Sequence, residues 1–559
     1  MLDKKHIVPV PDGAIVKSDR VVLWTIQKVY LKDKRYNKDK RRMIGKTLEA
    51  DREKMYPNDT YKELFPDIYD DYARTRIIPP SSQSIGCYVV LKVIAERLPL
   101  CETLIEVFGK QDADLILDYA MYQIIYESNV SQHFEASMKN MALFSEKLRS
   151  DSYLSEFFKK ALTEDKIDYF IEQWSTRIIK ARGYYGVYLN VDGSNVDCEA
   201  KGVTIREHGH DKSGQGTTVV NMMYAVAPDG TPVTYYQYRG NVVDEKAVKY
   251  MILYFDGLKV KIRGICVDRG FCNKDNTDML RSKGIDFVLM VESLPVGYKE
   301  AIHTLRSDIK NNIDHWIEGS ELFGDTVEKK LFKNDECDTY LHAYYECGRA
   351  GNGVKDLLRR INRAKSQALK SIKQKKNVVI PSEMKNYIGL RKGRGPKTLE
   401  TYYDKIQEAI DDKGFHVLAT SEKMTALEAY KIYHARDSSE KQFMFMKTEL
   451  GEDTYRGGSD ATIAGKQLVA FVAGILRNEI LLASEKMLKE EDRLDRYSVP
   501  AIIQELKTIR IKRLPGDEYA MVMDLSNRDK LMLKHLGITE KTLNEYVAIQ
   551  ALRIKGRNR

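Results

Sequence analysis

Two aspartates follow apolar segments that have the pattern of β-strands. Asp192 comes after residues 187–191 (VYLNV), and Asp268 comes after residues 263–267 (RGICV). Strand ends in an α/β sheet can aim side chains from a rigid backbone into a shared crevice. Two carboxylates in such a crevice could hold a divalent metal ion, but the pair alone does not define a site.

Four further side chains share one face of a helix predicted near residues 426–450. At about 100° per residue they fall within a stripe roughly 60° wide. They are Tyr433, Arg436, Glu440 and Lys447. The stripe suits a carboxylate that holds a metal beside cations that hold phosphates. The alternative is an exposed, salt-bridged face, because Arg436 and Glu440 are an ordinary i, i+4 pair.

The elements that would position these residues alternate in a defined order. Strands are predicted at 187–193, 217–230, 231–240, 263–268 and 286–291, with helices at 241–257 and 275–283. A Pro-Asp-Gly turn joins the second and third strands. Three consecutive strands followed by alternating helices and strands imply a mixed sheet covered by helices. The ribonuclease H-like fold shares this order.

The chain is predicted to contain six regions. They are an N-terminal basic, β-rich DNA-binding region (1–102), a helical subdomain (103–182), the first part of the α/β core (183–295), a β-containing insertion (296–412), the second part of the core with the Glu440 helix (413–485) and a helical C-terminal region (486–559).

Two segments concentrate positive charge. Residues 28–46 hold nine Lys or Arg against two Asp in a predicted hairpin, and residues 355–376 hold nine against one in a predicted helix. Both compositions suit a phosphate backbone, and both also suit a solvated surface. The candidate DNA contacts are Lys34, Arg35, Arg41 and Arg42 in the hairpin and Arg359, Arg360 and Arg363 in the helix.

Composition narrows the class of protein. The 559 residues are 43% hydrophobic and 31% charged, and these fractions exclude a disordered chain and a membrane bundle. The net charge is +9. The seven cysteines include no CxxC pair, which argues against a disulfide framework or a thiolate zinc site. Apolar runs such as 467–476 are shorter than a bilayer span, and no signal segment is evident. We therefore expect a cytoplasmic protein, nucleoid-associated when bound to DNA, with no membrane partner.

The combined pattern resembles a known family. The spacing Tyr433, Arg436, Glu440 and Lys447 matches the signature Tyr-x2-Arg-x3-Glu-x6-Lys of bacterial insertion-sequence DDE transposases, in the branch with an insertion between the second Asp and the Glu. Further similarity lies in VDGSN around Asp192, in VDRGF around Asp268, and in the G-N-x-x-D of Gly240, Asn241 and Asp244. Relatives often have an aromatic residue before the Glu, whereas Ser438 and Ser439 stand here.

The resemblance implies a ribonuclease H-like core with a catalytic triad of Asp192, Asp268 and Glu440 that binds two Mg²⁺ or Mn²⁺ ions. It implies that Tyr433, Arg436 and Lys447 contact backbone phosphates. The implied activity is cleavage at the terminal inverted repeats of an element and strand transfer into double-stranded target DNA, by a cut-and-paste route and with a homodimer that holds two ends. The alternatives are a related metal-dependent nuclease and a domesticated DNA-binding regulator.

Other signals carry less weight. Asp437 points some 60° away from Glu440 on the helical wheel, so a surface role is favoured. His208 and His210, with Asp211 next to them, could suggest a metal site, but the two histidines lack a third ligand at a suitable spacing. The glycine-containing segment 211–218 lacks the Walker spacing, which disfavours a nucleotide-driven motor.

Overall fold

The structure is a computed structural model, and it describes most of the chain. The described residues are 2–3, 7–31, 36–48, 52–66, 68–69, 82–209, 216–257, 262–391, 397–445, 454–491, 497–514, 518–521 and 525–556. The chain forms two units: Met1–Ser82 with Lys512–Ala520 and Val547–Arg559, and the larger Gln83–Ile511 with Met521–Tyr546.

The smaller unit contains a five-stranded antiparallel sheet in the order β1-β5-β4-β3-β2. Its elements are β1 (Val8–Pro9), β2 (Ile15–Val16), β3 (Val21–Leu31), β4 (Tyr36–Thr47), β5 (Lys54–Pro57) and the helix α1 (Asp59–Leu64). Val22, Ile44, Met55 and Tyr61 are fully buried in its core. The predicted basic hairpin is confirmed as β3 and β4, while its tip, with Lys34 and Arg35, lies outside the described residues.

The larger unit is built on a ten-stranded mixed sheet. Five neighbouring strands of this sheet lie in the order β10-β9-β7-β11-β12. In chain order they are β7 (Tyr188–Cys198), β9 (Thr218–Val226), β10 (Pro232–Arg239), β11 (Gly264–Val267) and β12 (Asp286–Met290). The first three form an antiparallel meander, and β11 is parallel to both β7 and β12. The predicted strands are confirmed, and the arrangement is compatible with a ribonuclease H-like core.

Local sequence explains the turns and helices between these strands. At the Pro-Asp-Gly turn, Gly230 has φ +85°, a conformation that residues with a Cβ rarely adopt, and its amide donates to the carbonyl of Ala227 at 2.9 Å. The crossover helices are α9 (Asp244–Gly257) and α10 (Lys274–Ser282). Both agree closely with the helices predicted from apolar periodicity. β8 (Glu207–His208) pairs with β9, and β18 (Thr454–Tyr455) pairs with β7.

Strands from the predicted insertion extend the same sheet. β17 (Phe415–Thr420) pairs with β12 on one side and with β14 (Thr339–Glu346) on the other, and β13 (Leu322–Lys329) forms the edge. All three contacts are antiparallel. α11 (Val296–Ile309) precedes β13 in the chain. The two insertion strands are therefore continuous with the sheet that carries the candidate site.

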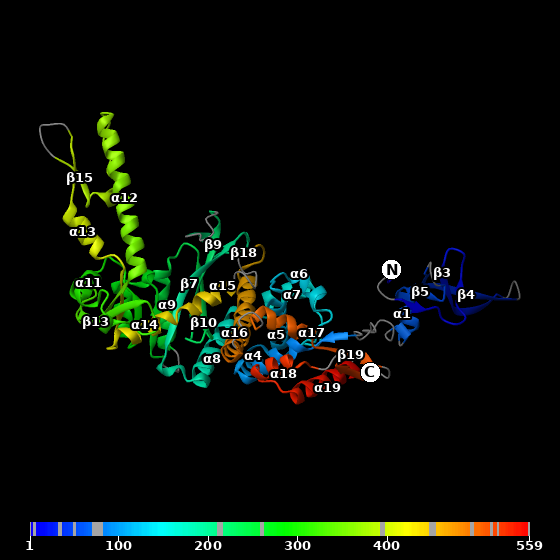
Figure 1. Ribbon diagram of the computed structural model, residues 1–559. Coiled ribbons are helices and arrows are strands. Elements are labelled where there is room, and N and C mark those ends of the chain that lie inside the picture. Colours follow the sequence, from blue (N-terminus) through cyan, green and yellow to red (C-terminus); the bar gives the residue numbers. More distant parts are fainter. Residues whose placement is uncertain are drawn as a thin grey trace. The chain divides into compact units, whose positions relative to one another are not determined.

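The rest of the insertion has a hydrophobic cluster of its own. The long helix α12 (Cys347–Lys373) runs beside α13 (Tyr403–Asp411) and β15 (Ile388–Leu390), as Figure 1 shows. β15 pairs with β16 (Leu399–Thr401). The cluster is formed by Leu357, Ile361, Ala364, Met384, Ile388 and Ile406. Of the basic segment 391–397, residues 392–396 lie outside the described residues.

Helices form most of the rest of the chain. Before the sheet come α3 (Gly86–Arg97), α4 (Leu100–Phe108), α5 (Lys110–Tyr126), α6 (Ser131–Met138), α7 (Asp151–Lys160) and α8 (Glu164–Arg182); after it come α16 (Asp460–Glu491), α17 (Val499–Thr508), α18 (Asn527–His535) and α19 (Glu540–Gly556). The predicted helical character of the C-terminal region is seen in α17, α18 and α19. The C-terminal region also contains β19 (Arg510–Leu514) and β20 (Glu518–Met521), which the sequence pattern did not indicate.

Helix α16 is longer than the apolar run 467–476 suggested. The most apolar 18-residue stretch within Asp460–Lys489 has a mean hydropathy of 1.4, and among the described residues this is the one helix long and apolar enough to cross a membrane by those two criteria. However, 89% of its most apolar stretch is buried inside the protein, as in a core helix.

Candidate active site

The two aspartates lie side by side on adjacent parallel strands. Asn190 and Val191 of β7 are in register with Cys266 and Val267 of β11, so Asp192 and Asp268 come next on each. Asp268 follows the last residue of β11, as predicted. Asp192, however, is inside β7 rather than at its end, because β7 continues to Cys198 against β9 after the pairing with β11 stops.

Each aspartate is anchored by the backbone amide that follows it. Gly193 N donates to Asp192 Oδ1 at 2.8 Å, and Arg269 N donates to Asp268 Oδ1 at 2.8 Å. The Asp192 side chain is 21% exposed. Because backbone groups fix one oxygen of each carboxylate, both side chains are oriented before any ligand binds.

The helix predicted near residues 426–450 is not continuous. The structure has α14 (Ala426–His434) and α15 (Asp437–Met444), with Ala435 and Arg436 between them. The prediction that Tyr433, Arg436, Glu440 and Lys447 share one face of a single helix is therefore wrong in its geometry. At this break Asn190 Nδ2, from β7, donates a hydrogen bond to the carbonyl of Ala435 at 2.9 Å. The two residues are 245 positions apart in the sequence.

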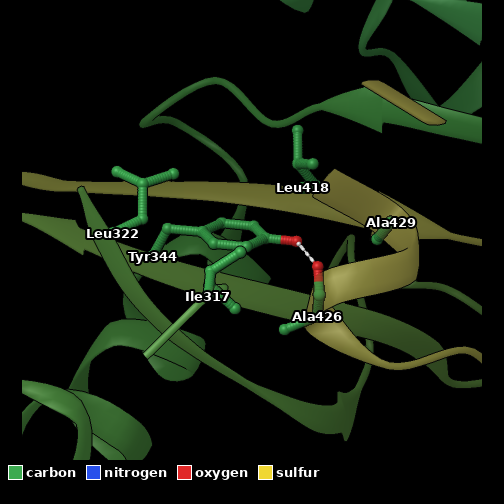
Figure 2. Close-up of a cluster of buried hydrophobic side chains, with 6 residues drawn as sticks. All are labelled: Ile317, Leu322, Tyr344, Leu418, Ala426 and Ala429. Carbon is green, nitrogen blue, oxygen red and sulfur yellow. Dashed lines mark hydrogen bonds between the residues drawn. The ribbon is translucent and has the colours of Figure 1, made fainter. Parts of the chain in front are cut away.

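Helix α14 rests on the insertion strands. Figure 2 shows the ring of Tyr344, from β14, among Ile317, Leu322, Leu418, Ala426 and Ala429. Its hydroxyl donates to the carbonyl of Ala426 at 2.6 Å, in the first turn of α14. Thr425 and Glu428 form a capping box at the same helix end. Burial, a hydrogen bond and a cap thus fix the helix that leads to the site.

The side chains of Tyr433 and Arg436, just before and within the break between α14 and α15, contact the carboxylates. Tyr433 Oη donates to Asp268 Oδ1 at 3.0 Å. Arg436 Nη1 lies 3.3 Å from Asp192 Oδ2, and its Nη2 lies 2.8 Å from Glu440 Oε1. The guanidinium is also 5.4 Å from the centre of the Tyr433 ring, within the range of a cation–π contact. Arg436 therefore connects two of the three predicted catalytic acids.

Exposure and charge differ sharply across the site. The Arg436 side chain is 11% exposed, whereas that of Glu440 is 58% exposed. Burial alone would lower the pKa of Arg436, but the neighbouring Tyr433, Asp268, Asp192 and Glu440 more than offset it, so the pKa rises. Burial, together with the charge of Asp268, raises the pKa of Tyr433. The arginine is thus held charged and the tyrosine protonated.

A fourth carboxylate, that of Asp244, lies against Gly193, the residue after Asp192. Asp244 begins α9, and its carboxylate lies so close to Gly193 that a Cβ there would be 2.4 Å from Oδ2. Tyr238 Oη donates a hydrogen bond to Asp244 Oδ1. Burial and the charges of Asp244 and Asp192 raise the pKa of Tyr238. The signal in the sequence was the G-N-x-x-D spacing that ends at Asp244.

The loop before Asp244 is held tightly. Asn221 Nδ2 donates to the carbonyls of Arg239, Gly240 and Val242, at 3.3, 3.1 and 2.8 Å. A Cβ at Gly240 would lie 2.2 Å from the carbonyl oxygen of Val219, so only glycine fits. The glycine of the motif is therefore required by close packing against the backbone of β9.

Comparison with known families identifies this part of the chain. Residues 189–464 match the family model described as the transposase DDE domain. Residues 189–464 belong to this family. The matched range includes Asp192, Asp268 and Glu440 as well as the insertion. No curated protein sequence matches the chain.

The donors of the DDE domain suit a hard divalent cation. Asp192, Asp268 and Glu440 offer carboxylate oxygens, which Mg²⁺ and Mn²⁺ prefer. Within the described residues, however, no three His, Cys, Asp or Glu side chains lie close enough together to hold a metal. Arg436 lies between two of these acids, 3.3 Å from Asp192 Oδ2 and 2.8 Å from Glu440 Oε1. The donor chemistry fits the metal, whereas the three acids do not close into a cage.

The other predicted phosphate contacts belong to other elements or lie outside the described residues. Lys447 of the DDE domain belongs to the second group. Arg359, Arg360 and Arg363 are exposed on α12, where Arg360 pairs with Glu383 at 2.7 Å. Arg41 and Arg42 are exposed on β4 of the smaller unit, with Arg41 2.8 Å from Asp39. Asp437, by contrast, pairs with His434, with 3.5 Å between Oδ2 and Nδ1.

Proposed function

We propose that this chain is a transposase that cuts double-stranded DNA at the terminal inverted repeats of its element and joins the freed ends to target DNA. The observation that carries the proposal is the placement of Asp192 and Asp268 in register on parallel strands, with Glu440 linked to Asp192 through Arg436. The match to the transposase DDE domain supports the reaction class.

The proposed reaction is phosphodiester displacement. Two Mg²⁺ or Mn²⁺ ions held by Asp192, Asp268 and Glu440 would supply activation of the attacking oxygen and stabilisation of the leaving one. The chain's own residues orient the DNA: Arg436 presents a planar fork that matches a phosphate, and Tyr433 holds Asp268 in place. Water is the attacking group in the cut, and the freed 3′-hydroxyl is the attacking group in the joining step.

We also propose which cations contact DNA, how many subunits act together and where in the cell the reaction occurs. The exposed cations Arg41 and Arg42 on β4, and Arg359, Arg360 and Arg363 on α12, would contact the DNA backbone together with Lys34, Arg35 and Lys447. Two ends must be handled jointly, so we propose a homodimer in the synaptic complex and a cut-and-paste route. The reaction would occur on DNA in the cytoplasm.

The test is a Mg²⁺-dependent cleavage and strand-transfer assay on DNA that carries the ends flanking the gene. Asp192→Asn and Glu440→Gln should reduce both products to background while end-DNA binding persists. Asp437→Asn is the matched control, because it removes one acid from the same helix without touching the triad. Cleavage without joining would favour a nuclease, and binding without either reaction would favour a regulator.

A further inference from the structure

Arg436 occupies the position between two acids of the proposed metal site. Its two terminal nitrogens lie 3.3 Å from Asp192 Oδ2 and 2.8 Å from Glu440 Oε1, and its side chain is 11% exposed. The other oxygen of Asp192 accepts from Gly193 N. Both oxygens of Asp192 are thus engaged by the protein itself. A divalent cation placed on Asp192 would meet a fixed positive charge within contact distance.

The same guanidinium has a second possible partner. Arginine binds phosphate and carboxylate with the same two-pronged geometry, so a DNA phosphate can replace the carboxylates as its ligand. Arg436 lies in the break between α14 and α15, where its amide donates to the carbonyl of Tyr433 at 3.1 Å and the adjacent Ala435 is anchored by Asn190. The backbone is therefore fixed, and an exchange of partners requires only a side-chain rotation.

We propose that Arg436 couples DNA binding to metal binding: without DNA it bridges Asp192 and Glu440, and a DNA phosphate draws it away and leaves both carboxylates to the divalent cations. This inference rests on the proposed function. Because linkage is reciprocal, metal strengthens DNA binding by the factor by which DNA strengthens metal binding. Arg436 is thereby a positioning residue that keeps the metal site closed until DNA is present.

The test measures Mn²⁺ affinity rather than activity. Free Mn²⁺ is followed by electron paramagnetic resonance during titration of the full chain, at constant ionic strength, with and without a pre-cut duplex that has no bond left to cleave. In the DNA-free protein, Arg436→Gln should bind Mn²⁺ about tenfold more tightly than wild type, and the duplex should then add little. In wild type the duplex should itself tighten Mn²⁺ binding by a similar factor.

Two variants separate bridging from general electrostatics. Arg436→Lys keeps the charge but replaces the two terminal nitrogens by a single ammonium, which cannot occupy both Nη positions, so it should tighten Mn²⁺ binding relative to wild type. Unchanged affinity would show that charge alone acts and would overturn the proposal. Lys441→Gln removes a cation from α15, the helix that carries Glu440; Lys441 lies 3.8 Å from Glu485, and its loss should leave Mn²⁺ affinity unchanged. It serves as the matched control.

Failure of this inference is distinguishable from failure of the proposed function. If Arg436→Gln leaves the DNA-free Mn²⁺ affinity within about twofold of wild type, or weakens it, the coupling is refuted even if the enzyme cuts and joins DNA. If the affinity changes as expected but wild type neither cuts nor joins, the metal site and its arginine stand while the transposase proposal falls.

Discussion

Replacement of Gly193 by alanine tests whether close packing behind Asp192 is essential. The added Cβ would lie 2.4 Å from Asp244 Oδ2 and 2.6 Å from its Cγ, whereas ordinary contact begins at 3.4 Å. The Asp244 carboxylate must therefore move by about 1 Å, although it is short and accepts a hydrogen bond from Tyr238. Because Asp244 begins α9, the strain reaches both the strand that carries Asp192 and a helix.

The expected cost combines two terms. Overpacking typically costs about 1–3 kcal/mol, and a strained hydrogen bond to a charged group adds up to about 2 kcal/mol, so we expect Gly193→Ala to lower the free energy of unfolding by about 3 kcal/mol. Urea denaturation measures this loss. DNA cleavage should fall as well, since Gly193 N holds Asp192 Oδ1.

A double-mutant cycle assigns the loss to Asp244. In an Asp244→Ala background the obstructing carboxylate is gone, so Gly193→Ala should cost at least about 1 kcal/mol less than in wild type. Gly186→Ala is the control, because a Cβ at that position meets nothing within 4 Å. The reasoning is refuted if Gly193→Ala costs less than about 0.5 kcal/mol, or if its cost is the same in both backgrounds.

Two further predictions concern the sheet under α14. Tyr344→Phe leaves the carbonyl of Ala426 without its 2.6 Å hydrogen bond and should cost about 1–3 kcal/mol in urea unfolding, whereas Tyr345→Phe should cost little; equal costs would contradict the role of that bond. Burial lowers the pKa of His342 to about 4 from 6.5, so the unfolded chain binds the proton first as pH falls. The free energy of unfolding should therefore drop by at most about 3 kcal/mol between pH 6.5 and 4. Urea unfolding curves at a series of pH values should lack this drop for His342→Gln. If the variant and wild type show the same dependence of unfolding free energy on pH, His342 is not the source of the drop.

The sequence predicted the parts of the site that depend on local pattern. Strand periodicity correctly located β7 and β11, and the pairing of these strands brings Asp192 and Asp268 together. The spacing of Tyr433, Arg436 and Glu440 predicted their convergence, although a continuous helix was the wrong reason. Their contacts with the aspartates and with one another bring them together in the structure.

Features set by long-range contacts could not be predicted in this way. The break between α14 and α15 depends on Asn190, which is 245 residues away from Ala435 in sequence. The proximity of Asp244 to Gly193 depends on how α9 begins after the loop held by Asn221. The pairing of β14 with β17 likewise joins segments that hydrophobic periodicity describes only one at a time.

The continuity of β13 and β14 with the main sheet limits how this protein can change its length. Helix α14, which leads to Arg436 and Glu440, packs on Tyr344 of β14, so those two strands support the helix that leads to the candidate site. The α12 to β16 portion, by contrast, has a hydrophobic cluster of its own. A designer who wished to shorten the chain, or to graft a new DNA-contacting tip, would have to cut beyond the end of β14 and rejoin before β17.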